Sequence, residues 1–257
     1  MKPPAPKPRP AFPARLPAGT PAPAPARLAK ATQAPHRPTP SGVGMESSAV
    51  RAAMVRKLQA QGISHPGVVA AMLAVERHRF VDTALVNQAY EDTSLPIGQG
   101  QTISKPSVVA RMVELLCQAP SAPLGRVLEI GTGCGYQAAV LSQVAREVYS
   151  IERIRSLHEK ARENLRPLRV PNLHLILGDG MLGFTQGAPY AAIIAAAGGN
   201  DLPEAWIDQL AVGGRLVAPA VTAGGRQNLV VVDKTARGIV RTELEAVLFV
   251  PLKSGLA

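Results

Sequence analysis

Three glycines and one acidic residue are spaced as a nucleoside-binding site requires. Gly131, Gly133 and Gly135 follow a short apolar run, and glycine lets the backbone turn sharply and lets a ligand approach without a Cβ in the way. Glu152 follows Gly131 by 21 residues, at the end of the next apolar run. A carboxylate in that position can accept hydrogen bonds from both hydroxyls of a ribose. The pattern therefore predicts that Gly131, Thr132, Gly133, Gly135 and Glu152 contact a cofactor.

The glycine spacing separates two classes of cofactor. Dinucleotide folds prefer G-x-G-x-x-G, in which backbone amides face a pyrophosphate. Residues 131–135 instead give G-x-G-x-G. S-adenosylmethionine has no phosphate, so this spacing is compatible with it. The spacing argues against a dehydrogenase without excluding one, and a tight turn that serves only packing is the remaining alternative.

A second acidic residue lies in the segment Gly178-Asp179-Gly180, directly after a third apolar run. An aspartate at the carboxyl end of a sheet strand lies in the ligand crevice, where its oxygen can accept a hydrogen bond from an adenine amino group. Asp-Gly is also a common turn pair. Beside the glycine turn and Glu152, a cofactor-binding role for Asp179 and Gly180 is the stronger prediction.

The segment from Pro96 to Ser104 combines deformable backbone with uncharged polar side chains. Gly98 and Gly100 allow it to bend, and its polar residues include Gln101, Thr102 and Ser104. Ser104 precedes Lys105-Pro106, where a helix is expected to begin, so helix capping is an alternative role for it. The two roles are compatible with each other.

The elements that must position these residues alternate along the chain. Apolar runs predict strands at 126–130, 147–152, 173–177, 191–196 and 215–217, with helices at 136–145 and 154–165. Such alternation predicts an α/β fold, a doubly wound and mostly parallel sheet with helices on both faces. The runs 229–232 and 246–250 have little helix between them, which predicts an antiparallel edge.

The N-terminal segment has a composition of its own. Residues 1–40 hold 13 of the 24 prolines and seven of the basic residues, with no acidic residue. We expect 1–45 to be a disordered tail, because it has few large apolar groups to stabilise a fold. Residues 46–257 then form one α/β domain, whose first part, 46–123, is mainly helical. The tail carries +7 of the net charge of +10, so the remainder has only +3 and does not suggest nucleic acid.

Cysteine and histidine spacing excludes several classes of site. Cys117 and Cys134 form no C-x-x-C pair, and the five histidines show no metal-ligand spacing. We therefore expect neither a metal site nor a disulfide framework. No apolar run approaches the roughly 18–20 residues that a membrane span needs. A cytoplasmic enzyme that binds neither a membrane nor nucleic acid is the resulting expectation.

Taken together, these motifs resemble one known family, the protein-L-isoaspartate O-methyltransferases. The resemblance runs from Arg51 to Leu256. Its carriers are Leu-Pro-Ile-Gly-Gln-Gly-Gln-Thr-Ile-Ser-Lys-Pro from residue 95, Val-Leu-Glu-Ile-Gly-Thr-Gly-Cys-Gly-Tyr-Gln from 127, Gly-Asp-Gly from 178, Gly-Gly-Arg-Leu-Val from 213 and Phe-Val-Pro-Leu from 249. The sequence departs from the family at Ala191, where an aspartate is usual, and at 197–200, which lacks a common proline.

The resemblance implies a fold, a reaction and site residues. It implies a seven-stranded, doubly wound sheet that binds S-adenosylmethionine. The reaction is methylation of the free α-carboxylate of isoaspartyl residues, which begins the repair of damaged proteins and peptides. Ser104 would have the family's active-site role, while Gln101, Thr102 and Ile103 would border cofactor and substrate. We expect a monomer.

Two other functions remain as alternatives. One is a different S-adenosylmethionine-dependent methyltransferase, acting on a small molecule or on RNA. The other is a nucleic-acid-binding protein that uses the basic tail. The uncharged segment before Ser104 argues against the first, and the ordinary charge balance of residues 41–257 argues against the second.

Overall fold

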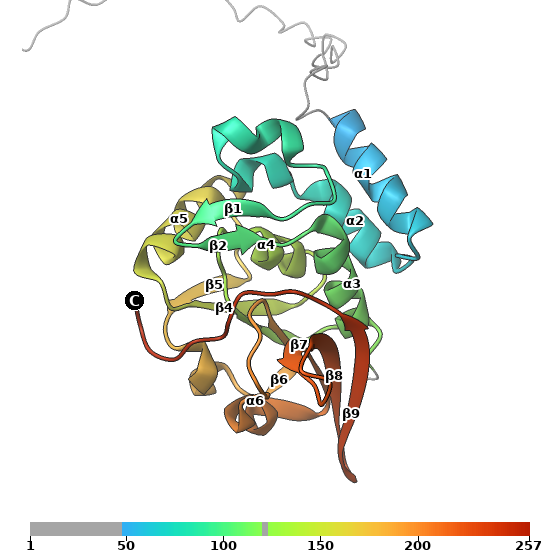
Figure 1. Ribbon diagram of the computed structural model, residues 1–257, viewed down its shortest axis with the longest axis vertical. Coiled ribbons are helices and arrows are strands. Elements are labelled where there is room, and N and C mark those ends of the chain that lie inside the picture. Colours follow the sequence, from blue (N-terminus) through green and yellow to red (C-terminus); the bar gives the residue numbers. More distant parts are fainter. Residues whose placement is uncertain (1–47, 120–122) are drawn as a thin grey trace, which may run out of the picture. The chain divides into compact units, whose positions relative to one another are not determined.

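A seven-stranded sheet forms the centre of the computed structural model, which describes residues 48–119 and 123–257 (Figure 1). Its strand order is β5-β4-β3-β6-β7-β8-β9, and β7, β8 and β9 are antiparallel neighbours while the other pairs are parallel. This confirms the predicted doubly wound fold. The expected disordered tail, residues 1–45, lies outside the described residues. The strands of the sheet are β3 (Arg126–Ile130), β4 (Glu147–Glu152), β5 (Leu173–Leu177), β6 (Tyr190–Ala195), β7 (Leu210–Val221), β8 (Gln227–Thr235) and β9 (Gly238–Ala246).

Helices connect the parallel strands, and a small hairpin precedes the sheet. Among the described residues, no helix combines the length and the apolar character that crossing a membrane would require. The α-helices are α1 (Ser48–Ala60), α2 (Pro66–Ala74), α3 (Pro106–Cys117), α4 (Tyr136–Ser142), α5 (Arg155–Leu165) and α6 (Glu204–Gln209). The hairpin pairs β1 (Leu95–Gly98) with β2 (Gln101–Ile103), and short 3₁₀ turns include η1 (Arg77–Phe80) and η4 (Gly180–Leu182).

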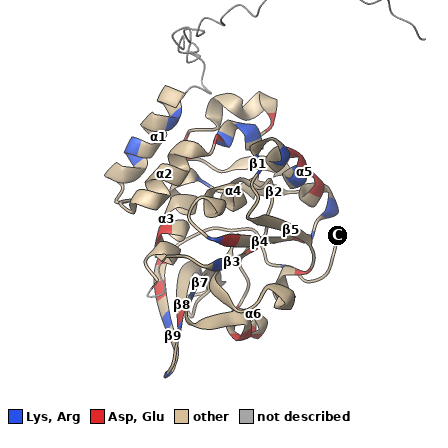
Figure 2. Cartoon of the chain, turned by 180° about the vertical axis from the view of Figure 1, so that it is seen from behind, with Lys and Arg blue, Asp and Glu red and all other residues tan. Residues whose placement is uncertain are grey.

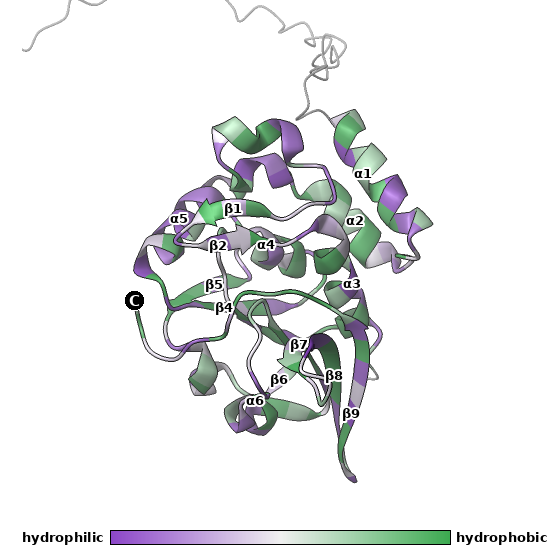
Figure 3. Ribbon diagram, viewed as in Figure 1, coloured by the Kyte–Doolittle hydropathy of each residue, from purple (hydrophilic) through white to green (hydrophobic). Residues whose placement is uncertain are grey.

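The core lies on both faces of the sheet because strand residues alternate between the faces. Val127 packs in a cluster with residues of α1 to α5, whereas its neighbour Leu128 packs in a second cluster with Trp206 of α6. Figure 3 shows hydrophobic residues along the strands and polar residues on outer elements such as α5. The indole Nε1–H of Trp206 donates to the carbonyl of Gly180 (2.7 Å), so α6 holds the turn that follows β5.

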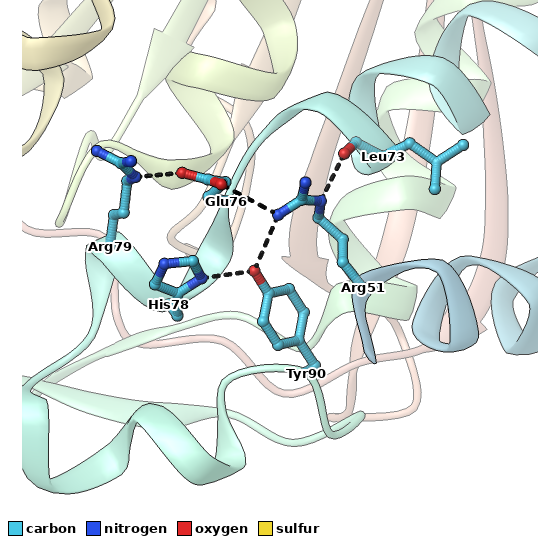
Figure 4. Close-up of polar contacts among 6 residues, drawn as sticks. All are labelled: Arg51, Leu73, Glu76, His78, Arg79 and Tyr90. Carbon is cyan, nitrogen blue, oxygen red and sulfur yellow. Dashed lines mark hydrogen bonds and ion pairs between the residues drawn. The ribbon is translucent and has the colours of Figure 1, made fainter. Parts of the chain in front are cut away.

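A polar network joins α1 to the chain that leads into β1 (Figure 4). The guanidinium of Arg51 donates to the carbonyl of Leu73 (2.6 Å) and to the Tyr90 hydroxyl (3.5 Å). His78 also contacts that hydroxyl (2.7 Å). Glu76 pairs with Arg51 and, as Figure 4 shows, with a second arginine, Arg79.

Arg77, which lies between Glu76 and His78 in the sequence, is fully buried. Its Nε donates to the carbonyl of Ala89 (2.8 Å) and its Nη2 to that of Thr93 (3.3 Å). Its guanidinium lies 4.8 Å from the ring centroid of Tyr136, the first residue of α4. Arg77 therefore fixes the segment before β1 against the helix that follows the glycine turn.

The predicted strand at 246–250 is wrong. The last strand is Gly238–Ala246, and residues 247–250 belong to no strand. A short turn after Thr235 leads into Gly238, whose φ of 131° suits glycine, and this turn sets 238–246 against β8. The pattern misled because β9 is a mostly exposed edge strand, whereas Val247 and Phe249 pack against the core beyond its end. Helix α4 also ends at Ser142, before the predicted end at 145.

Glu129 places a carboxyl group inside the sheet. Parallel pairing sets it opposite Ser150 of β4, whose hydroxyl donates to Glu129 Oε2 (2.5 Å) and contacts the hydroxyl of Thr132 (2.6 Å). Glu129 is fully buried, and this burial raises its pKa to about 8, although the hydrogen bond from Ser150 lowers it. Near neutral pH the protonated form of Glu129 therefore predominates.

We predict that Glu129→Gln flattens the dependence of stability on pH. Between the ordinary pKa of 4.5 and the folded-state pKa of about 8, the folded protein keeps a proton that the unfolded chain has lost. The free energy of unfolding therefore falls as pH rises through this window, by up to about 1.4 kcal/mol per pH unit. Glutamine mimics the protonated carboxyl and removes this slope. Denaturant unfolding at pH 5, 6, 7 and 8 measures it, with the exposed Glu163→Gln as control. Equal slopes in wild type and Glu129→Gln would show that Glu129 titrates normally.

We predict that Arg77→Met lowers the free energy of unfolding by about 3 kcal/mol, because one buried carbonyl and one partly buried carbonyl lose a charged donor. Arg79→Met is the control, since the Arg79 side chain is 47% exposed and its ion pair is worth less than about 1 kcal/mol. Urea unfolding of both variants measures the difference. Similar small losses in both variants would mean that the Arg77 hydrogen bonds contribute little.

Candidate active site

The main cavity lies at the carboxyl ends of the central strands. It has a volume of about 590 Å³ and is bordered by the ends of β3, β4 and the segment after β6. From β3 the chain winds outward to β4 and β5 and then returns to β6 on the other side, and this point of reversal is where α/β sheets bind ligands. Six predicted cofactor residues line the cavity: Gln101, Thr102, Gly131, Gly133, Glu152 and Gly180.

The glycine turn brings backbone to the cavity floor. Gly131 has a φ of 91°, and its N–H donates to the carbonyl of Ile151 on β4 (2.8 Å). A Cβ on Gly133 would lie 3.2 Å from Cδ1 of Ile97 in the β1–β2 hairpin. Glycine at 133 therefore lets the hairpin lie directly over the turn as part of the cavity wall.

Glu152 joins the glycine turn to the start of α5. Its Oε2 accepts the N–H of Gly133 (2.9 Å) and its Oε1 accepts the N–H of Ile154 (2.9 Å). The residue is 5% exposed and lines the cavity. Each carboxylate oxygen keeps a second acceptor site, so Glu152 can also accept from the two ribose hydroxyls of a bound cofactor.

Asp179 holds the C-terminal segment as well as its own turn. Its Oδ1 accepts the N–H of Met181 (2.9 Å) and its Oδ2 that of Gly255 (2.6 Å). The neighbouring Gly180 lines the cavity, whereas Asp179 is not among the lining residues. The contact between Asp179 and adenine stays a prediction. The structure shows a different role for Asp179, which is to hold the segment around Gly255 by a hydrogen bond.

Ser104 lies in a second cavity of about 420 Å³. Thr102, Ala196 and Val250 border both this cavity and the larger one, so the two spaces meet at these side chains. The lining is otherwise Ser94, Lys105, Val108 and residues 246–249. Two ligands, one in each cavity, would therefore lie next to each other. The side chains that border the place where they meet are small or uncharged.

The alternative role of Ser104 as a helix cap is wrong. The N-cap of α3 is Lys105, and Asp92, from the segment before β1, accepts the N–H of Ser107 (2.9 Å). Ser104 precedes the cap by one residue, which leaves the first turn of the helix to Asp92. Among the described residues, no hydrogen-bond partner engages the Ser104 hydroxyl, so it is available to a ligand.

The other predicted residues support the site from beneath. Ile103 and Thr132 border a space of about 40 Å³ between Ser104 and the glycine turn. Gly135 faces α5, where a Cβ would lie 2.8 Å from Cδ1 of Leu165. Its cofactor contact stays a prediction, and the structure shows that Gly135 lets α4 and α5 pack closely.

Several lining residues were not predicted from the sequence. Arg153, Arg155 and Glu159 come from the chain directly after Glu152, so proximity to that acid was a usable signal for them. Lys253 and Ala257 also line the cavity, because the chain after β9 crosses the carboxyl ends of the strands and ends near α5 (Figure 1). No motif indicated that crossing.

The C-terminal segment is fastened to the cavity rim. Arg153 donates to the carbonyls of Gly255 (2.8 Å) and Ser254 (3.3 Å). The N–H of Leu252 donates to the carbonyl of Gly198 (2.8 Å), within the stretch 197–200 that departs from the family pattern. Basic and acidic residues both occur along the neighbouring α5, as the colours of Figure 2 show. The rim thus combines fixed backbone with charges of both signs.

Ala191, the other departure from the family pattern, lies away from the cavities. It is the second residue of β6, at the amino end of that strand, whereas the cavities lie at the carboxyl ends. A Cβ on Gly125 would lie 3.3 Å from the Ala191 Cβ, so the site is tightly packed. Ala191 therefore takes part in packing at the amino ends of the strands, away from the cavities.

The chain as a whole is similar to one group of proteins. Residues 49–257 match the family described as protein-L-isoaspartate(D-aspartate) O-methyltransferase. A protein-L-isoaspartate O-methyltransferase of Methylibium petroleiphilum is 58% identical over 97% of both chains. One from Leptothrix cholodnii is 61% identical over 84% of this chain and 77% of its own.

Solved structures agree with the sequence comparisons. A structure named protein-L-isoaspartate O-methyltransferase has a TM-score of 0.72 and 30% identity, covering 80% of this chain and 67% of its own. A putative enzyme of the same name from Plasmodium falciparum, in complex with S-adenosyl-L-homocysteine, has a TM-score of 0.69 and 25% identity, covering 79% and 98%. With its glycine turn, Glu152 and Ser104 placed around two adjoining cavities, the chain belongs to the protein-L-isoaspartate(D-aspartate) O-methyltransferase family.

Proposed function

We propose that this chain transfers a methyl group from S-adenosylmethionine to the free α-carboxylate of isoaspartyl residues in damaged proteins and peptides. The observation that carries the proposal is the meeting of two cavities at Thr102, Ala196 and Val250. The larger holds an acid suited to ribose recognition, and the smaller holds the Ser104 hydroxyl. Family membership makes isoaspartyl residues the substrate.

The donor set of the larger cavity fits S-adenosylmethionine. Glu152 has acceptor sites for the ribose, and the backbone of Gly131 and Gly133 admits a ligand closely. Gln101 and Thr102 line the wall beside them. When bound there, the cofactor supplies an electrophilic methyl group.

The residues around Ser104 orient the nucleophile instead of activating it. A substrate carboxylate, with a pKa of about 4, is already ionised at neutral pH and needs no general base. The Ser104 hydroxyl donates a hydrogen bond that aligns one carboxylate oxygen. That oxygen bonds to the methyl carbon as the carbon–sulfur bond breaks, and the products are a methyl ester and S-adenosylhomocysteine. Orientation of this kind contributes up to roughly 7–11 kcal/mol in favourable systems.

A methyltransferase acting on RNA fits the second cavity less well. Leu248, on its border, is 96% exposed, which suits contact with a polypeptide better than with a phosphate backbone. We also propose that the enzyme acts as a monomer in the cytoplasm and does not bind nucleic acid. Its two cysteines are free and buried, in keeping with a reducing compartment.

Release of methanol from methyl-labelled product tests the proposal directly. The protein is incubated with labelled S-adenosylmethionine and either an isoaspartyl peptide or the aspartyl peptide of the same sequence. We expect turnover of the first and on the order of 10²-fold less of the second, because the carboxylate is displaced by about 1 Å or more. Equal turnover of both peptides would refute the substrate assignment.

We predict that Glu152→Ala weakens binding of S-adenosylhomocysteine by about 1.5–3 kcal/mol, because a charged acceptor is lost. Calorimetric titration measures the affinity, and the melting temperature shows whether the glycine turn survives without its Gly133 contact. Unchanged affinity in a folded variant would remove Glu152 from the cofactor site.

We predict that Ser104→Ala lowers kcat while the affinity for S-adenosylhomocysteine stays nearly constant. Its melting temperature should match that of wild type, because Ser104 does not cap α3. Steady-state kinetics on an isoaspartyl peptide measure the change. Wild-type kcat in this variant would show that Ser104 does not orient the substrate.

A further inference from the structure

A third cavity continues the one that contains Ser104, and we propose that it binds a side chain of the substrate polypeptide about three residues from the isoaspartyl residue. This inference rests on the proposed function. The cavity has a volume of about 310 Å³. Val108, Ala246 and Val247 border both it and the Ser104 cavity, so the two form one groove.

One wall of the groove is a single face of α3. Val108 and Arg111 are three residues apart within α3, which places them on the same side of the helix, and Ser104 lies two residues before its first helical residue. Ser104 borders the first cavity, Val108 borders both and Arg111 borders the second. The opposite wall is the end of β9 and the segment that follows it, from Glu245 to Leu248.

The length of the groove matches a short stretch of extended chain. Arg111 follows Pro106, the first residue of α3, by five residues, which at about 1.5 Å per residue corresponds to about 8 Å along the helix axis, and Ser104 precedes Pro106 by two residues of non-helical chain. An extended peptide advances about 3.3 Å per residue. A substrate whose isoaspartyl carboxylate reaches Ser104 therefore presents its third neighbour to Arg111.

The lining of the third cavity predicts which side chains it accepts. Ile63, Val108 and Leu229 give it an apolar floor. At the rim, Arg111 on α3 pairs with Glu245 on β9 across the groove (3.1 Å), with 38% and 47% of these side chains exposed. Because this ion pair has no net charge, the cavity favours an apolar side chain. It disfavours an acidic side chain, and a glycine offers no side chain to fill it.

Peptides of two lengths test the subsite. The long peptides carry three residues on each side of the isoaspartyl residue, with leucine, aspartate or glycine at one third position, and the short peptide carries one residue on each side. We expect leucine to raise kcat/KM over glycine and aspartate about three- to tenfold, mainly through KM, on one side only. Leucine without effect on either side would overturn the proposal.

Two variants locate the effect. Gln61→Trp fills the cavity from an exposed position, and Arg111→Ala removes the rim pair. Both should reduce the leucine advantage of the long peptide and leave the short peptide unchanged. Arg241→Ala is the matched control. Arg241, which is on β9, forms a comparable ion pair with Asp201 (3.0 Å), and its side chain is 38% exposed like that of Arg111. It lines none of the three cavities.

The outcomes separate this inference from the proposed function. An unchanged ratio of long-peptide to short-peptide kcat/KM in both variants would show that the cavity does not contact substrate. Equal losses on long and short peptides would show an effect transmitted to Ser104, which also overturns the subsite. If wild type methylates neither peptide, the proposed function itself fails.

Discussion

The carboxylate of Glu152 fixes the geometry on which the cofactor cavity depends. Its two oxygens accept N–H groups from Gly133 and Ile154, and so hold together the turn after β3 and the chain entering α5. Without this pairing, two backbone donors at the cavity floor would lack a partner, which is costly in a buried place. The same acid is the acceptor that a ribose would require, so the cofactor recognition that we propose would depend on the side chain that also holds the local fold.

The carboxyl group of Glu129, which lies on the neighbouring strand, is held mostly in its neutral form by burial. Glu152 accepts backbone N–H groups and borders a cavity, whereas Glu129 is fully buried and its pKa is raised to about 8 by that burial. A largely neutral Glu129 can bond Ser150 without adding a second negative charge beneath the glycine turn. The turn is therefore supported by one acid that borders the cavity and by a second, mostly uncharged acid beneath it.

Local sequence patterns were sufficient to predict the central strands of the sheet. They also predicted the part of the site that the glycine turn and Glu152 form. The apolar runs ending at Ile130, Glu152 and Leu177 predicted three parallel strands whose carboxyl ends meet, and this placed the glycine turn and Glu152 together. The chain after β9 was not predictable in this way. Its position depends on hydrogen bonds that the backbone N–H groups of Leu252 and Gly255 donate to residues far away in sequence. Such contacts leave no periodic signal in the sequence.

The role of Ser104 illustrates a finer limit. A serine just before Lys-Pro is a reasonable helix cap by local rules, yet Asp92 reaches that helix end from the preceding segment. Local preference does not reveal such a tertiary substitute. The network of Arg77 with Ala89 and Thr93, which positions that preceding segment, was equally invisible in the sequence pattern.

The edge strand β9 has a bearing on how a repair enzyme coexists with its targets. Damaged proteins expose extended segments, and an open sheet edge is a template onto which such segments add as extra strands. Residues Arg241, Glu243 and Glu245 place charges of both signs along this mostly exposed edge. Charged edges discourage strand addition. These charges therefore oppose the pairing of an extended substrate segment with β9.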